Sequence, residues 1–257
     1  MLKFQGQGCH NLQLVSPTHF VPHILEALEI ATSRGFRLPL VYNTGGYESL
    51  DTLKLLEGIV DIYLPDLKYG DPDVAEKYSG VEDYTRIAME AIKEMYRQVG
   101  NLVFDECSVA VRGLLVRHLV LPEGLAGTEE CMKFLTSLSP RITVLITSEY
   151  WPANIAYAHP PLHRRITQKE WEEAIKTAQG HGIDVALSLR MYRARHLEAE
   201  LLGLCYFHEE FCREWGDENY ARLGRWEQVG KKGGEQLWLT RPTRETSAPM
   251  QNQCSKD

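Results

Sequence analysis

Five apolar runs of the sequence end in polar side chains that could bind or transform a ligand. The runs end at Ser16-Pro17-Thr18-His19, Asn43-Thr44, Asp66-Leu67-Lys68, Arg117-His118 and Glu149-Tyr150. Hydroxyl, amide, carboxylate and guanidinium groups repeated at strand ends are typical of the mouth of an α/β barrel or sheet, where such folds keep their chemistry. The sequence therefore predicts one shared site at the carboxyl ends of several strands.

The first pair of interest is Asp66 and Lys68, two residues apart at the end of a buried apolar run. If strand geometry continues through the pair, both side chains point to the same face. A lysine at such a mouth can act as a Schiff-base nucleophile, as a cation for a ligand carboxylate, or only as the ion-pair partner of Asp66. The spacing leaves these three interpretations open.

Two further strand ends carry ligand-binding groups. Asn43 and Thr44 precede a Gly-Gly pair, so a tight turn there can present donors to a ligand, although a bare turn explains them equally well. Arg117 and His118 are neighbours in a strand and must point to opposite faces. Arg117 is the stronger site candidate, because a guanidinium inside a barrel needs an anionic partner. His118 is predicted to be a hydrogen-bonded core histidine.

Charge and composition exclude several classes of protein. A net charge of −7 and a pI of about 5.8 argue against nucleic-acid binding. No apolar stretch approaches the ~20 residues of a spanning helix, and no signal peptide is recognisable, so we expect no membrane association and a cytoplasmic location. The six cysteines are scattered over 257 residues and do not form a secreted disulfide framework. No Cys and His spacing indicates a metal site, so no metal ligand is assigned.

Apolar runs rich in β-branched residues alternate with segments of helical period. Strands are expected near residues 12–15, 38–42, 59–64, 114–121, 142–146 and 184–189. Helices are expected over 20–34, 50–56, 84–99, 128–138 with Thr128 as N-cap, and from a capping box at 167–170 to about residue 181. This order predicts right-handed parallel crossovers and an α/β fold, either an open sheet or a partial (β/α) barrel.

The sequence also indicates a division near residue 189. Residues 1–189 carry the α/β pattern, whereas residues 197–215 have helical spacing alone and the remainder is rich in Gly, Arg, Lys, Gln and Pro. Such a composition buries too little apolar surface to offset its ordering entropy. Residues 190–257 are therefore predicted to be a helix followed by a loose, disordered tail.

Five segments of the sequence resemble one family closely. They are GCHNLQLVSPTHFVPHIL, LPLVYNTGGYE, VDIYLPDLKY, DYTRIAMEAIKEMYRQVG and RGLLVRHLVLPEG. Over about residues 3–189 the chain resembles the radical S-adenosylmethionine proteins related to pyruvate formate-lyase activating enzyme. The resemblance implies a partial parallel (β/α) barrel with a 4Fe-4S cluster at its mouth. It also implies a 5′-deoxyadenosyl radical that abstracts hydrogen from a protein or small-molecule partner.

The resemblance further implies an S-adenosylmethionine site made of six residues. Ser16 and Thr18 stand where the second strand of the family meets the amino end of the methionine moiety. Asn43 stands in the third-strand motif, Asp66 and Lys68 in a D-x-K motif that lines the cofactor, and Arg117 in an R-x-x-x-x-P strand that reaches the same site. A ligand with a cationic sulfonium and its own carboxylate suits a mouth that holds one carboxylate and two cations.

The sequence departs from the family in its cysteines. The family binds its cluster through CxxxCxxC after the first strand, whereas this chain starts at about the second strand and has no such motif. Because thiolates hold iron–sulfur clusters, we expect the cluster ligands and the first βα unit to be missing. The sequence thus indicates a truncated, activating-enzyme-like protein with no assigned catalytic residue and with its radical chemistry in question. Two alternatives remain open: a non-catalytic module that binds a ligand or a protein, and a lysine-dependent, aldolase-like lyase that uses Lys68.

Overall fold

The structure is a computed structural model of the chain. It describes residues 1–106 and 109–183, together with the backbone of residues 226–232 and 235–240. The chain divides into two compact units, Met1–Leu204 and Cys205–Asp257. The first unit contains a six-stranded sheet and all of the described helices, and the second contains a pair of strands.

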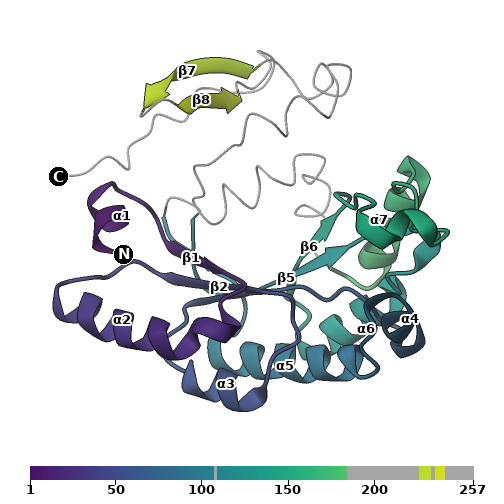
Figure 1. The fold of residues 1–257 in the computed structure, drawn as a ribbon, viewed down its shortest axis with the longest axis horizontal. Coiled ribbons are helices and arrows are strands. Elements are labelled where there is room, and N and C mark those ends of the chain that lie inside the picture. Colours follow the sequence, from purple (N-terminus) through teal and green to yellow (C-terminus); the bar gives the residue numbers. More distant parts are fainter. Residues whose placement is uncertain (107–108, 184–225, 233–234, 241–257) are drawn as a thin grey trace. The chain divides into compact units, whose positions relative to one another are not determined.

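The six-stranded sheet forms the centre of the first unit (Figure 1). Four parallel strands lie in the order β1 (Leu12–Val15), β2 (Leu40–Thr44), β3 (Ile62–Pro65) and β5 (Ala110–Leu119). Two strands share the other side of β5: β4 (Val103–Phe104) pairs antiparallel with its beginning, and β6 (Thr143–Thr147) pairs parallel with its end. The carboxyl ends of β1, β2, β3, β5 and β6 therefore meet at one rim of the sheet.

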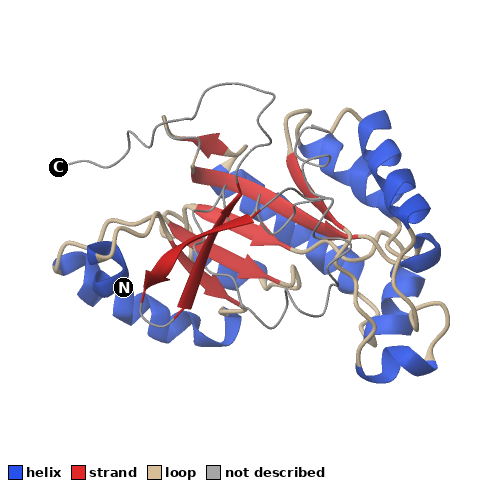
Figure 2. Ribbon diagram, turned by 90° about the horizontal axis from the view of Figure 1, so that it is seen from above, coloured by secondary structure: helices blue, strands red, loops and turns tan. Residues whose placement is uncertain are grey.

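Helices follow the parallel strands and cover the sheet. They are η1 (Thr18–Phe20) and α2 (Val21–Ser33) after β1, α3 (Leu50–Leu55) after β2, α4 (Pro72–Ser79) and α5 (Tyr84–Val99) after β3, η2 (Pro122–Gly124) and α6 (Thr128–Leu138) after β5, and η3 (Asn154–Ala158) and α7 (Gln168–Gly180) after β6. A short helix, α1 (Leu2–Gly6), precedes the sheet. Figure 1 shows α2, α3, α5 and α6 along one face of the sheet, and Figure 2 shows the strands side by side from above.

This arrangement is a mixed α/β fold with a mostly parallel sheet, consistent with a partial (β/α) barrel, and it confirms the predicted fold class. Every residue of β2 and β3 is buried, which explains their nearly continuous apolar runs. The helix α5 buries a stripe that includes Ala88, Ile92, Met95 and Val99. Within the described residues, no helix is both long enough and apolar enough to cross a bilayer.

The strand boundaries differ from the sequence prediction for local reasons. The strand β3 begins at Ile62 rather than at residue 59, because the backbone N–H groups of Ile59 and Val60 still bond to the carbonyl of Leu56 at the end of α3. The strand β5 begins at Ala110, four residues before the predicted start at Leu114, because β4 pairs with its beginning. Neither β4 nor α4 was predicted.

The helix boundaries agree better with the sequence. Both α5 and α6 have the predicted bounds, and the capping box of Thr167 and Glu170 opens α7 as predicted. The predicted N-cap role of Thr128 is wrong: Gly127, with φ of 61°, takes that position, and Thr128 is the first residue of the helix.

The hydroxyl of Thr128 instead contacts His118, which is fully buried in β5. His118 Nδ1 lies 2.8 Å from the carbonyl oxygen of Leu67, and Nε2 lies 3.0 Å from Thr128 Oγ1. Because a carbonyl only accepts, Nδ1 donates to Leu67 and Nε2 accepts from Thr128. His118 is thus the hydrogen-bonded core histidine that the sequence predicts, and it ties the segment after β3 to β5 and α6.

The second unit contains β7 (Trp226–Lys232) and β8 (Glu235–Thr240), which pair antiparallel. The sequence analysis assigned no strand to these residues. The strand expected at 184–189 and the helix expected at 197–215 lie outside the described residues. The domain division at residue 189 therefore stays a prediction.

We predict that His118 makes folding stability fall as the pH is lowered. Burial lowers the pKa of His118 to about 4. Between the pKa of an unfolded histidine, about 6.5, and this value, the unfolded chain takes up a proton that the folded chain does not. This stability is present above pH ~6.5 and is lost towards pH ~4, by about 3 kcal/mol.

The measurement is chemical denaturation of the wild type and of His118→Gln across this pH range. Paired carboxyl groups such as Glu94 and Glu170 also lose stabilisation in acid, since their pKa values are lowered by hydrogen bonds from Arg97 and Arg164. The difference in the pH dependence of unfolding free energy between the two proteins gives the contribution of His118. Identical pH slopes for both would contradict the assignment.

Candidate ligand-binding site

Backbone pairing brings three strand ends together at the rim. The N–H of Asp66 donates to the carbonyl of Thr44 at 2.9 Å, and the N–H of Leu67 donates to the carbonyl of Arg117 at 2.9 Å. Asp66 and Arg117 form an isolated parallel bridge beyond the end of β3. The segment after β3 therefore lies between the ends of β2 and β5.

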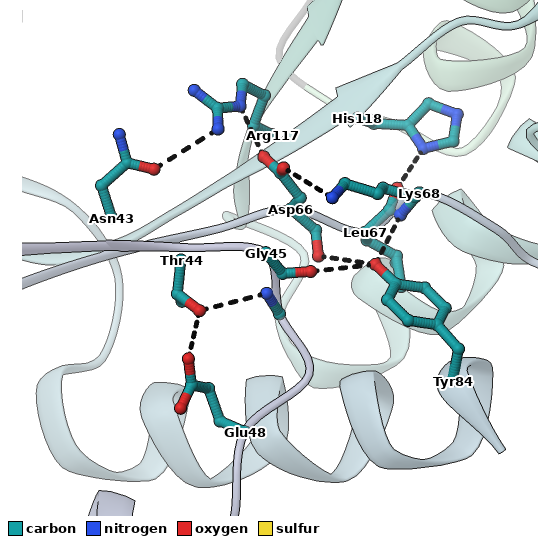
Figure 3. A network of polar contacts seen from close by, with 11 residues as sticks. Asn43, Thr44, Gly45, Glu48, Asp66, Leu67, Lys68, Tyr84, Arg117 and His118 are labelled. Atoms are coloured by element: carbon teal, nitrogen blue, oxygen red, sulfur yellow. Dashed lines mark hydrogen bonds and ion pairs between the residues drawn. The ribbon is translucent and has the colours of Figure 1, made fainter. Parts of the chain in front are cut away.

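Asp66 lies at the centre of the charged side chains at this rim. Its Oδ1 lies 2.5 Å from Arg117 Nε, and its Oδ2 lies 3.5 Å from Lys68 Nζ. Arg117 Nη2 also donates to Asn43 Oδ1 at 3.3 Å, so one guanidinium joins β2 to the segment after β3 (Figure 3). The side chain of Asp66 is 17% exposed and that of Lys68 is 43% exposed. Lys68 is thus the charged group of this rim cluster with the most surface left for a ligand.

Tyr84, the first residue of α5, closes the rim from the helical side. Its hydroxyl lies 3.1 Å from the carbonyl of Gly45 and 3.3 Å from that of Asp66, and it accepts the N–H of Lys68 at 3.2 Å. Burial raises the pKa of Tyr84, so this hydroxyl keeps its proton. It holds the turns after β2 and β3 against each other, which fixes the backbone beneath Lys68.

A second polar cluster lies beside the first. The carboxylate of Glu48, which is 3% exposed, accepts hydrogen bonds from the hydroxyls of Thr18 and Thr44, and Tyr42 OH lies 3.4 Å from Glu48 Oε2. Burial raises the pKa of Tyr42 to about 12, with a smaller contribution from the charge of Glu48. Hydroxyl groups, rather than cations, therefore surround this carboxylate within the described residues.

The six residues predicted for a ligand site thus fall into two adjoining groups. Four of them, Asn43, Asp66, Lys68 and Arg117, form one network. Ser16, with φ of 49°, is exposed at the end of β1 and donates its backbone N–H to the carbonyl of Asn43 at 2.8 Å. Thr18 belongs to the Glu48 cluster, at 2.6 Å from Glu48 Oε1.

Two residues of this rim were missed by the sequence analysis. Glu48 lies in a turn, where the sequence has no helical or strand periodicity. The sequence identified Tyr84 only as the first residue of an amphipathic helix. Both make contacts with residues 16 or more positions away, and Glu48 also has local contacts with Tyr42 and Thr44. The one available hint for Glu48 was an acidic residue two positions after the Gly-Gly pair.

The described cysteines do not supply a cluster site at this rim. Cys9 precedes β1 and so lies towards the amino ends of the strands. Cys131 is buried in α6, where burial raises the pKa of its thiol and Sγ lies 3.6 Å from the carbonyl of Ala126. Among residues 1–106 and 109–183, no three His, Cys, Asp or Glu side chains are grouped so that they could hold a metal ion. A 4Fe-4S cluster therefore does not fit the described thiols.

Comparison with known proteins gives one curated relative. No family model matches the sequence. An uncharacterized protein of Methanocaldococcus jannaschii is 30% identical over 165 residues, which is 64% of this chain and 45% of that protein. The chain thus spans less than half the length of the curated relative that it matches.

Among solved structures, a domain of pyruvate-formate lyase-activating enzyme from Bacteroides vulgatus is similar to this chain with a TM-score of 0.48 and 13% sequence identity. The similarity covers 67% of this chain and 95% of that domain.

We predict that Gly46→Ala disrupts the contact between the two rim turns. Gly46 has φ of 86°, and a Cβ there would overlap the backbone oxygen of Asp66. The matched control is Gly58→Ala, with φ of 76° and nothing within 4 Å of the added Cβ. The control should cost about 1–2 kcal/mol for the backbone alone, and Gly46→Ala at least about 1 kcal/mol more. Equal losses in urea denaturation would show that the turns do not depend on this close approach.

Proposed function

We propose that the rim cluster of Asn43, Asp66, Lys68 and Arg117 binds S-adenosylmethionine. We also propose that the chain is related to the radical S-adenosylmethionine proteins of the activating-enzyme type. The observation that carries the proposal is the Asp66 carboxylate held between two cations at the carboxyl rim of a parallel sheet. Motif resemblance over residues 3–189 supports the choice of ligand.

The charges of the cluster suit the charges of this ligand. S-adenosylmethionine carries a sulfonium cation, an ammonium group and a carboxylate. Lys68 can meet the carboxylate, because its side chain is 43% exposed and its ammonium lies at the rim beside Asp66. Asp66 supplies the negative charge that a sulfonium or ammonium needs nearby, in a partly buried site where charge pairing is stronger than in water.

The remaining residues position these groups. Arg117 fixes one oxygen of Asp66 and reaches Asn43, so the carboxylate cannot rotate freely. Tyr84 holds the backbone of Asp66 and Lys68 from below. Such preorganisation lowers the entropy that a ligand loses on binding. The proposed role of this chain is therefore to bind and orient the ligand for a protein or small-molecule partner.

The ion pair of Lys68 argues against the lyase alternative. A Schiff-base lysine must present its amine to a carbonyl carbon, whereas Lys68 Nζ lies 3.5 Å from the carboxylate of Asp66 in an ion pair. Borohydride trapping of a carbonyl compound on Lys68 would favour the lyase instead.

We predict that Lys68→Ala weakens the binding of S-adenosylmethionine by about tenfold or more, because the ligand carboxylate loses its cation. The control is Lys169→Ala, which removes a lysine from an ion pair with 85% side-chain exposure on α7. Isothermal titration calorimetry measures both. Unchanged affinity in Lys68→Ala, or an equal loss in the control, would contradict the assigned site.

We further predict that the 257-residue chain does not cleave S-adenosylmethionine reductively. A cluster with one open iron needs three protein thiolates on converging positions, and the sequence contains no CxxxCxxC. The test is anaerobic reconstitution with iron and sulfide, followed by iron analysis and chromatography for 5′-deoxyadenosine with dithionite as reductant. Stoichiometric cluster iron together with 5′-deoxyadenosine would overturn this prediction and restore the radical-enzyme interpretation.

A further inference from the structure

The strand β1 forms one edge of the six-stranded sheet. Within the described residues it pairs only with β2, in a register without a bulge. The backbone N–H groups of Leu12 and Ser16 donate to carbonyl groups on the β2 side, at 2.9 and 2.8 Å. Because backbone groups alternate between the two sides of a strand, those of Gln13 and Val15 point away from β2. The outer edge of β1 therefore presents two N–H donors and two carbonyl acceptors to another strand.

This edge is open to a second strand. Natural proteins protect sheet edges with charged side chains, prolines, bulges or covering elements. The sequence of β1, Leu-Gln-Leu-Val, contains neither a charge nor a proline, and Val15 is 69% exposed. At the other end of the parallel series, residues 144–147 of β6 are at most 5% exposed. Of these two edges in the described part of the chain, β1 is thus the accessible one.

Apolar side chains flank the edge at both ends of β1. Leu2 and Phe4 are exposed on α1, before the strand, and Phe20 is exposed at the end of η1, after it. An edge of four residues buries too little surface for a stable complex, which needs about 1,200 Å² or more. A partner on this edge must therefore cover the flanking side chains as well as the backbone.

A second copy of the chain can approach this edge without charge repulsion. The protein has a net charge of −7, which opposes self-association over most of its surface. Histidines apart, Lys3 is the one ionisable side chain that residues 1–25 contain besides Cys9. These residues form α1, β1 and η1 and the beginning of α2. The region around the edge thus carries little of the charge that keeps two copies apart.

The edge is also complementary to itself. A two-fold axis makes the two β1 strands antiparallel. When Leu14 lies opposite Leu14 of the second copy, Gln13 lies opposite Val15 and Val15 opposite Gln13. The outward groups of these residues then form four hydrogen bonds. The same pairing brings α1 of one copy to η1 of the other, so the exposed apolar side chains of both elements can be covered.

We infer that the chain forms a two-fold symmetric dimer through antiparallel pairing of its β1 strands. The pairing continues the six-stranded sheet of one copy into that of the other. The carboxyl rims of the two copies point in opposite directions, because the paired strands do. Each rim then has α1 of the other copy beside it. The inference concerns assembly and holds whichever ligand the rim binds.

The first measurement is sedimentation velocity of the full chain over a concentration series. The wild type should sediment as a dimer that dissociates on dilution. Val15→Pro removes an outward N–H group and leaves the bonds to β2 intact. It should raise the dissociation constant about thirtyfold, because two of the four hydrogen bonds are lost. The matched control, Val15→Thr, keeps the N–H group and the shape of the side chain, and its constant should stay within about threefold of the wild type.

The second measurement reads the register through a cross-link. Opposite residues of a non-hydrogen-bonded antiparallel pair lie about 4.5 Å apart between Cα atoms, which a disulfide can span. In a Cys9→Ser background, Leu14→Cys should form a disulfide-linked dimer on mild oxidation. Gln13→Cys is the matched control, because two cysteines at position 13 lie on a diagonal of about 7–8 Å and cannot be bridged. Non-reducing electrophoresis distinguishes the two proteins.

The outcomes decide the inference independently of ligand binding. A wild type that is monomeric across the series, or that carries another polypeptide in place of a second copy, overturns it. A dimer that Val15→Pro leaves intact also overturns it, as does equal cross-linking of Gln13→Cys and Leu14→Cys. The cross-link is measured in proteins that keep every backbone N–H of β1, so it decides the question even where the proline alters the fold.

Discussion

The rim of this protein depends on the placement of one residue, Asp66. Its backbone N–H bonds to the end of β2, its backbone carbonyl receives the hydroxyl of Tyr84, and its side chain binds both Arg117 and Lys68. The three surrounding segments take their positions relative to it. An isolated surface ion pair contributes little, but a partly buried carboxylate with two cations and backbone anchors cannot be removed without leaving its partners unpaired.

The two carboxylates of the rim are paired in opposite ways. Asp66 is neutralised by cations and keeps part of its surface exposed, whereas Glu48 is buried and receives only hydroxyl donors within the described residues. The first arrangement suits a charged ligand, because a cation such as Lys68 can exchange one anionic partner for another. The second suits a fixed framework, because a satisfied buried group resists rearrangement.

Where the signal was local, the sequence predicted the elements and which polar strand ends lie together. The apolar stripe of α5 and the capping box at Thr167 gave correct helix bounds, and the polar ends of the apolar runs identified Asn43, Asp66 and Arg117 as neighbours. The prediction for the strand ends succeeded because parallel strands bring their carboxyl ends together, whatever their separation in the chain.

The failures came from contacts that no local pattern encodes. Thr128 is an attractive N-cap by residue type, yet its hydroxyl serves the buried His118 ten residues earlier. The antiparallel strand β4 is two residues long and is fixed only by its pairing with β5. Glu48 and Tyr84 became visible as site residues only when the turns after β2 and β3 were seen to touch.

The divided pairing of β5 has a consequence for the order in which the protein assembles. Arg117 lies in the half of β5 that pairs with β6, at the register Arg117 to Leu145. The other half is held by β3 and β4. During synthesis from the amino end, Asn43 and Asp66 emerge from the ribosome long before β6 does. Arg117 is already bridged to the segment after β3 on one side, so we expect its other side to gain a partner last, when β6 joins the sheet.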